Sequence, residues 1–153
     1  MNAKPIPPVL PASRPVYTTR TPVLQIPSGN DGEKDSLTYF FDGYYDSSLS
    51  VPAGYDTSEP FAIGQMADLA IHLPLNDNSI VWWRTRVFDG YEYSMWSNTG
   101  KLVINTEPEQ PSIPTLISPS EQPGMPVFDL TPTMKWFAID PDPMDTIWYT
   151  LEV

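Results

Sequence analysis

The stretch IVWWRTRVF, residues Ile80–Phe88, alternates between two kinds of side chain. Because successive side chains of an extended strand point to opposite faces, the stretch predicts a β-strand with two different surfaces. One surface would carry Val81, Trp83, Thr85 and Val87, and the other Trp82, Arg84, Arg86 and Phe88. We expect the first set to lie in a core and the second, made of rings and cations, to face outward.

The composition around this stretch favours many short strands. Nineteen prolines and eight glycines disfavour long helices, while 41% hydrophobic residues argue against a disordered chain. Further strands are expected at Thr21–Pro27, Leu37–Asp42, Asp68–Leu73 and Leu102–Ile104. Asp89-Gly90 is a turn signal. About seven short strands in about 100 residues predict an all-β fold with two packed sheets.

Charge and residue usage exclude several classes of protein. A net charge of −11 disfavours binding to nucleic acid and to anionic membranes. The chain has no cysteine and one histidine, His72, which argues against a zinc site and against a Ser-His-Asp triad. No stretch reaches the ~18 apolar residues of a membrane-spanning helix. The first residues, MNAKPIPPVLPASRP, lack a signal-peptide core, as expected of a virion protein or of a piece of a longer chain.

The sequence also contains a repeat. TPVLQIPSGNDGEKDSLTYFF, residues 21–41, matches TPTMKWFAIDPDPMDTIWYTL, residues 131–151, at an offset of 110 residues, and Pro8-Val9-Leu10 matches Pro114-Thr115-Leu116 at an offset of 106. We therefore expect a domain at 5–106, a linker at 107–111, and the opening strands of a second, truncated domain at 112–153. In that second domain Ile147, Tyr149 and Leu151 would share one face of a strand.

Two segments resemble fibronectin type III domains. VWWRTRVFDGYEYSMWSNTGKLVIN, residues 81–105, is similar to the closing strands of that family, and TPTMKWFAIDPDPMDTIWYTLEV, residues 131–153, is similar to the opening strands. Ile26 departs from the tryptophan usual in the family, whereas Trp136 keeps it. The resemblance implies a fibronectin type III-like (immunoglobulin-like) β-sandwich followed by an incomplete second sandwich, as in bacterial surface or phage structural proteins.

The outward set of side chains has two interpretations. Ser94-Met95-Trp96-Ser97 looks like half of the tandem Trp-Ser box of cytokine receptors, which implies that Arg84 and Arg86 sandwich Trp96 in a structural ladder. A guanidinium over an indole gains about 0.5–2 kcal/mol. Alternatively, exposed rings form a platform for a sugar or a protein. The platform would use Trp82, Phe88, Tyr91 and Tyr93.

Two loops are acidic. DPDPMD, residues 140–145, offers Asp140, Asp142 and Asp145 as oxygen ligands for calcium, although the spacing is not that of an EF-hand. The parallel loop GNDGEKD offers Asn30, Asp31, Glu33 and Asp35. The alternative is a solvated turn in which aspartates cap backbone amides. Calcium is the one cofactor that the sequence suggests.

These observations favour a non-enzymatic module of a larger secreted or virion protein, with a spacing or adhesion role. Its partners would be neighbouring domains, other subunits or glycans, and its location extracellular, at a cell surface or in a virion. A carbohydrate-binding module is the first alternative. A filament subunit whose second domain is completed by strand exchange with another chain is the next.

Overall fold

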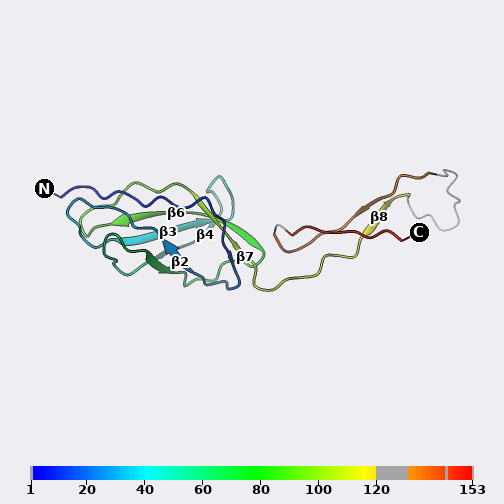
Figure 1. The fold of residues 1–153 in the computed structure, drawn as a ribbon, viewed down its shortest axis with the longest axis horizontal. Coiled ribbons are helices and arrows are strands. Elements are labelled where there is room, and N and C mark those ends of the chain that lie inside the picture. The colour runs from blue at the N-terminus through cyan, green and yellow to red at the C-terminus, as the bar shows by residue number, and fades with distance from the viewer. Residues whose placement is uncertain (1, 120–130, 144, 153) are drawn as a thin grey trace. The chain divides into compact units, whose positions relative to one another are not determined.

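The computed structural model describes residues 2–119, 131–143 and 145–152. The chain divides into two compact units, residues 1–107 (unit 1) and residues 108–153 (unit 2). Every regular element of the described residues is a β-strand, which confirms the predicted all-β class (Figure 1). None of these residues belongs to a helix long and apolar enough to cross a membrane.

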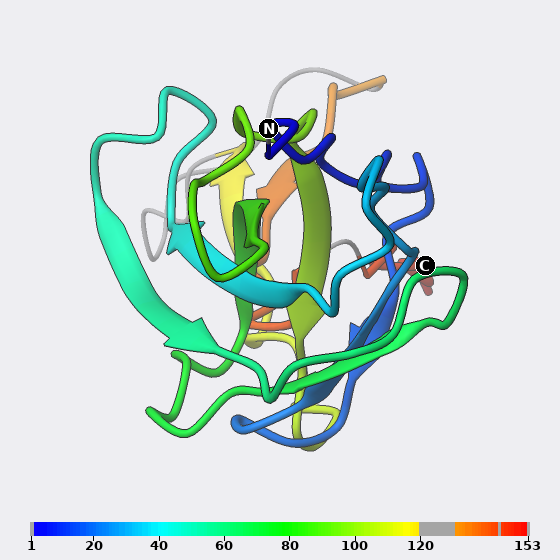
Figure 2. The same cartoon turned by 90° about the vertical axis from the view of Figure 1, so that its left-hand side faces the viewer.

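Unit 1 contains two sheets. Its strands are β1 (Val16–Tyr17), β2 (Val23–Ile26), β3 (Thr38–Tyr44), β4 (Pro52–Thr57), β5 (Ala67–Ala70), β6 (Ser79–Phe88) and β7 (Gly100–Ile104). One sheet has the order β1-β7-β6-β3-β4, and the other pairs β2 with β5 in antiparallel register. Figure 2 shows β2 and β5 side by side in a layer separate from β3 and β6.

Strand β6 is the centre of the larger sheet, and its alternation is confirmed. Val81, Trp83, Thr85 and Val87 are all buried, while the residues between them are half-buried. On one side β6 pairs with β3 over its last seven residues, with Phe41 opposite Thr85. On the other side it pairs with β7 only as far as Trp83, which lies opposite Gly100. The far end of this second edge is therefore left to another segment.

A single core joins the two sheets of unit 1. It takes every second residue from the strands of both layers, as expected when two sheets pack face to face. Its members include Leu24, Ile26, Leu37, Tyr39, Phe41, Leu69, Val81, Trp83, Val87, Leu102 and Ile104. The Phe41 ring lies 5.7 Å from the Trp83 ring between their centroids. The core thus connects β3 and β6 with β2 and β5 across the layers.

The expected strands are present with shifted boundaries, and the middle of unit 1 differs most from the sequence-based expectation. The strand predicted at Asp68–Leu73 is β5, Ala67–Ala70, and it stops early because its partner β2 begins only at Val23. Ile71 still donates to the Pro22 carbonyl at 3.0 Å, after which Pro74 has no amide to continue a ladder. The irregular middle of unit 1 forms β4, which pairs with β3 through a bulge at Gly43 and Tyr44.

Unit 2 contains the antiparallel pair β8 (Thr115–Ser118) and β9 (Lys135–Phe137). The Trp136 ring meets the Tyr149 ring edge-on at 5.7 Å between centroids. The strand predicted through Ile147, Tyr149 and Leu151 is wrong, because residues 145–152 have no strand assignment. In unit 1 the matching strand β3 lies between β4 and β6, whereas among the described residues of unit 2 β8 and β9 are paired only with each other.

The core makes a stability prediction. Leu69 is 0% exposed and Leu73 is 60% exposed, so the same Leu→Ala change removes either buried or solvated methyl groups. We expect Leu69→Ala to lower the free energy of unfolding by about 2–5 kcal/mol through lost burial and a residual cavity. Leu73→Ala should cost about 0.5 kcal/mol or less. Urea unfolding followed by tryptophan fluorescence measures both; equal losses would contradict the assigned core.

Candidate functional site

The segment Ser94–Ser97 covers the end of β6 that β7 leaves unpaired. Ser94 donates its amide to the Val87 carbonyl at 2.8 Å, and its Oγ accepts from the Val87 amide at 3.0 Å. Ser97 repeats the arrangement with Thr85, at 2.8 Å and 3.0 Å. Each serine therefore supplies one backbone donor and one side-chain acceptor to the same residue of β6. This end of the sheet edge is therefore covered by a segment that is not itself a β-strand.

The spacing of these serines sets the direction of the neighbouring rings. Ser94 and Ser97 are three residues apart, and both face β6. A repeat of three residues is the period of a polyproline II helix. Tyr93 and Trp96 are also three apart and both contact Arg86. Met95, on the remaining side, is 69% exposed. The Ser-x-x-Ser spacing thus directs two rings onto the outer face of the sheet.

The guanidinium groups of β6 alternate with rings. The Cζ atoms of Arg84 and Arg86 lie 4.3 Å and 4.7 Å from the Trp96 ring centroid. Since residues two apart on a strand are separated by about 7 Å, the indole lies between the two cations. Arg86 also lies 4.2 Å from the Tyr93 ring, and Arg84 lies 5.6 Å from the Tyr44 ring. Tyr44, Arg84, Trp96, Arg86 and Tyr93 form what we name the arginine–aromatic ladder.

Of the two arginines of the ladder, only Arg84 is paired with a carboxylate. Arg84 binds Asp42 Oδ2 through Nη2 at 2.9 Å and through Nε at 3.0 Å. The same oxygen accepts from the Tyr44 hydroxyl at 2.8 Å, and this hydrogen bond, with burial and the carboxylate charge, raises the pKa of Tyr44. Arg86 forms no ion pair with the described residues, and its Nε is buried without a hydrogen-bond partner. The faces of Tyr93 and Trp96 are therefore its main electrostatic contacts.

The turn after β6 fixes the start of this segment. Asp89 Oδ1 accepts from the amides of Tyr91 and Glu92 at 2.7 Å and 2.8 Å, and Asn2 Nδ2 donates to Asp89 Oδ2. Gly90 has a φ of +97°, a conformation that favours glycine. Burial acts to raise the pKa of the Asp89 carboxyl, but these hydrogen bonds together hold that pKa below its usual value.

Not every residue of the predicted face joins the ladder. Phe88 packs on Tyr93 at 4.7 Å between ring centroids, so it extends one end. Trp82 lies apart, with Lys101 Nζ 5.9 Å from its ring centroid. Tyr91 is 76% exposed. The structure thus places the guanidinium groups of Arg84 and Arg86 against the Trp96 ring, as the ladder interpretation expects. Trp82 and Tyr91 lie outside this ladder.

Sequence reasoning did not assign the residues that β3 contributes. Phe40, Asp42 and Tyr44 alternate along β3 with its buried residues and face the ladder. The Phe40 ring meets Tyr93 edge-on at 5.2 Å between centroids. The alternation of β3 in the sequence indicates that Phe40, Asp42 and Tyr44 share one face. That Asp42 lies opposite Arg84 follows only from the β3–β6 register, which the sequence alone does not give.

The carboxylates Asp42, Asp46 and Asp56, and the histidine, have local roles. Asp46, in the loop after β3, accepts hydrogen bonds from the Ser48 hydroxyl and from the amides of Val51 and Ser50. The bond from Ser48 contributes most, and together these bonds hold the pKa of Asp46 far below its usual value. Asp56 accepts from the His72 amide at 2.7 Å and meets His72 Nδ1 at 2.9 Å. Asp42 binds Arg84. Each of the three groups is therefore engaged in a separate local contact.

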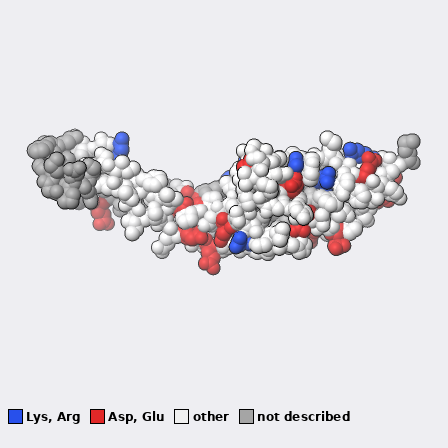
Figure 3. Space-filling view, turned by 180° about the vertical axis from the view of Figure 1, so that it is seen from behind, with Lys and Arg blue, Asp and Glu red and all other residues white. Residues whose placement is uncertain are grey.

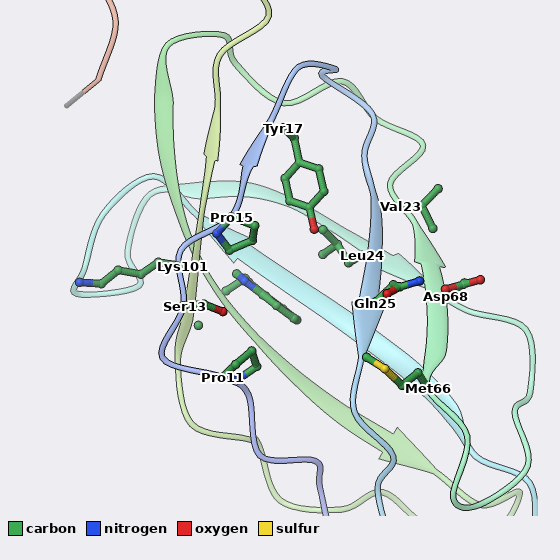
Figure 4. A pocket seen from close by; sticks show the side chains of 12 residues that line it. Pro11, Ser13, Pro15, Tyr17, Val23, Leu24, Gln25, Met66, Asp68 and Lys101 are labelled. Atoms are coloured by element: carbon green, nitrogen blue, oxygen red, sulfur yellow. The ribbon is translucent and has the colours of Figure 1, made fainter. Parts of the chain in front are cut away.

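Two of the hollows adjoin the sheets of unit 1. A cavity of about 500 Å³ lies between the N-terminal segment and β2, and Tyr17, Gln25 and Asp68 line it (Figure 4). Its other lining residues are Pro11, Ser13, Pro15, Val23, Leu24, Met66, Trp83, Gly100 and Lys101. A hollow of about 340 Å³ lies on the ladder face, lined by Phe40, Phe41, Asp42, Tyr55, Asp56, Arg86 and Trp96. Tyr55 is 78% exposed there.

The acidic loops differ between the units. Oxygens of Asp140, Asp142 and Asp145 lie within 4.8 Å of one another. In unit 1 the Asp31 carboxylate accepts from the amides of Glu33 and Asp35, both at 3.1 Å. Glu33 is turned toward the N-terminal segment, where both its oxygens accept from the Ala3 amide at 3.2 Å. The structure brings three acidic groups together in the second loop and not in the first.

Comparison with known proteins adds no assignment. No protein-family model, no curated protein and no solved structure matches the chain. The resemblance to fibronectin type III domains therefore stays a prediction that rests on the quoted residues.

On the face drawn in Figure 3, Lys and Arg side chains stand apart among neutral and acidic surface.

The ladder makes a prediction about energetic coupling. In a double-mutant cycle of Arg86→Met and Trp96→Leu, we expect a coupling free energy of about 0.5–2 kcal/mol, because each change removes the same cation–π contact. The free energy of unfolding of the four proteins gives this value. The matched cycle of Arg86→Met with Tyr91→Leu should give a coupling near zero, since Tyr91 is 76% exposed and outside the ladder. Strictly additive effects for Arg86 and Trp96 would contradict the ladder.

Proposed function

We propose that the chain is a non-enzymatic structural module, a spacer or adhesion unit of a larger secreted or virion protein, built on a fibronectin type III-like sandwich. The observation that supports this proposal is the arginine–aromatic ladder. Its cations and rings contact one another, with centroid distances of 4.2 Å to 5.6 Å. A ladder of this kind stiffens one face of a sheet, as a spacer requires.

The ladder also explains why so many large side chains occur in one short segment. Trp96 and Tyr93 cover the aliphatic stems and charged ends of two arginines, so that each ring removes apolar surface from water. The serine bonds to Thr85 and Val87 fix the segment on β6. A ligand that stacked on Trp96 would have to displace an arginine already in contact with it. This crowding therefore favours an architectural role over a binding role.

A carbohydrate-binding module is the second candidate, and the hollow beside the ladder favours it. Tyr55 is 78% exposed next to the carboxylate of Asp56 and the guanidinium of Arg86. Sugars are bound by an exposed ring that stacks on their apolar face and by polar groups that hydrogen-bond their hydroxyls. This second candidate uses Tyr55 in addition to the platform residues that sequence analysis suggested.

A glycan array tests both candidates. For the spacer we expect no glycan to bind the wild-type chain, because the rings of the ladder are occupied. Binding that Tyr55→Ala abolishes and Trp82→Ala preserves would establish the hollow as a sugar site. Binding lost with Trp82→Ala alone would establish the outer platform instead. Either form of binding by the wild-type chain would contradict the purely structural proposal.

A filament subunit is the third candidate, and the exposed side chains of unit 2 favour it. Trp148 is 90% exposed, and other apolar residues of this unit are more than half exposed. These are Ile113, Ile117, Phe137, Ile139 and Leu151. Apolar surface of this extent can mark a surface covered by another protein segment. Strand addition from a neighbouring chain would cover it.

Light scattering after size exclusion distinguishes the filament subunit from the spacer. The spacer predicts a monomer at all concentrations, whereas a filament subunit predicts a mass that grows with concentration. Trp148→Ser should then reduce the growth, since it removes the most exposed of the apolar side chains. Tyr91→Ser is the matched control in unit 1, where the ring is 76% exposed. A monomeric wild-type chain would exclude self-assembly.

A further inference from the structure

The loop at residues 140–145 brings three carboxylates to one point. Oxygens of Asp140, Asp142 and Asp145 lie within 4.8 Å of one another. Calcium binds oxygens at 2.3–2.6 Å, so ligands on opposite sides of one ion are about 5 Å apart. The three oxygens are therefore close enough to share a single ion. Ion pairs among the described residues involve only Asp56 and Asp42, so no Lys or Arg salt bridge balances this group.

Asp142 supplies an independent observation that points to a ligand. Its side chain is 3% exposed, and its Oδ2 accepts from the Glu109 amide at 2.7 Å. Its Oδ1 is buried and has no hydrogen-bond partner. A buried carboxylate oxygen without a partner is costly, because it has lost water and gained nothing in exchange. A bound cation would supply the missing interaction.

The rest of the loop is arranged to present these groups. Asp140 Oδ1 accepts from the Asp142 amide at 3.0 Å, which holds the first two carboxylates of the loop together. The Asp145 side chain is exposed, so one side of the group is open to water. Calcium takes six to eight oxygen ligands, and water completes the shell where the protein supplies fewer.

The equivalent loop of unit 1 shows what is specific to unit 2. Asp31 is 4% exposed, and its Oδ1 is also buried without a hydrogen-bond partner. However, Glu33 is drawn away by the Ala3 amide, and no group of three acidic side chains forms among residues 29–35. The buried aspartate is common to both units, whereas the converging carboxylates occur only in unit 2. Asp31 is therefore a matched control for Asp142.

We propose that Asp140, Asp142 and Asp145 form a calcium site in unit 2. The buried Asp142 is the anchoring ligand, and Asp140 and Asp145 close around the ion from the same loop. Calcium is favoured over magnesium because it loses water readily and tolerates irregular geometry, while magnesium requires a near-ideal octahedron. Binding would relieve the repulsion among three carboxylates and satisfy the buried oxygen of Asp142.

Isothermal titration of the chelator-treated full chain with CaCl₂ tests the proposal. We expect one site in the wild-type chain and at least about tenfold weaker binding with Asp145→Asn, since affinity depends on the number of charged ligands. Asp145 is exposed, so this variant should keep the fold. Asp142→Asn should weaken binding at least as much, and Asp31→Asn should leave it unchanged. Circular dichroism verifies that each variant is folded.

The controls define the outcomes that would overturn the site. Absence of calcium binding up to millimolar concentration would refute it. Equal weakening by Asp31→Asn and Asp145→Asn would show that the net negative charge attracts the ion without a defined site. Equal affinity for MgCl₂ would refute the assignment to calcium. Terbium luminescence sensitised by the tryptophans is a second readout, and it should disappear with Asp145→Asn and persist with Asp31→Asn.

Discussion

The position of β6 between two different environments is the constraint on which unit 1 depends. One face of the strand carries Val81, Trp83 and Val87 into the core, and the other carries Arg84 and Arg86 to the ladder. Because the side-chain period of a strand is two, a shift of one residue would bury both guanidiniums and expose the core residues. Both effects of such a shift are unfavourable, because it would desolvate two guanidinium groups and expose three apolar side chains to water. The ladder and the core therefore fix the same register from opposite sides.

The serine segment solves the problem of an edge that β7 does not reach. An ordinary strand there would alternate with period two and place only one kind of side chain over the arginines. With period three, Ser94 and Ser97 bind the backbone of β6 while Tyr93 and Trp96 cover its outer face. Hydrogen bonds that close the edge and rings that stack on the cations thus come from one segment of five residues, Tyr93–Ser97.

The sequence was sufficient for features that depend on local periodicity. The alternation of Ile80–Phe88 predicted the buried and outward sets, and the resemblance of Ser94-Met95-Trp96-Ser97 to a Trp-Ser box implied the contact of Trp96 with the arginines. It was insufficient where the partner lies far along the chain. Asp42 meets Arg84 only through the β3–β6 register, and the end of β5 depends on where β2 begins. Alternation through Ile147 and Leu151 was not enough to make a strand, because a strand also needs a paired neighbour.

Prolines are placed differently in the opening segments of the two units. Ile6 exchanges backbone hydrogen bonds with Asn30 in unit 1, and Ser112 bonds Ile139 in unit 2. In unit 2 the residues between Pro114 and Pro119 all have amides, and β8 occupies that interval beside β9. In unit 1, prolines at positions 5, 7, 8, 11 and 15 leave no interval of four such residues between Pro5 and β1. Proline cannot donate to a ladder, and the first regular pairing after these prolines is the short parallel one of β1 with β7. The cavity between this N-terminal segment and β2 is lined by Pro11, Pro15 and Val23, so the prolines that keep the segment out of an antiparallel ladder also border the hollow beside β2.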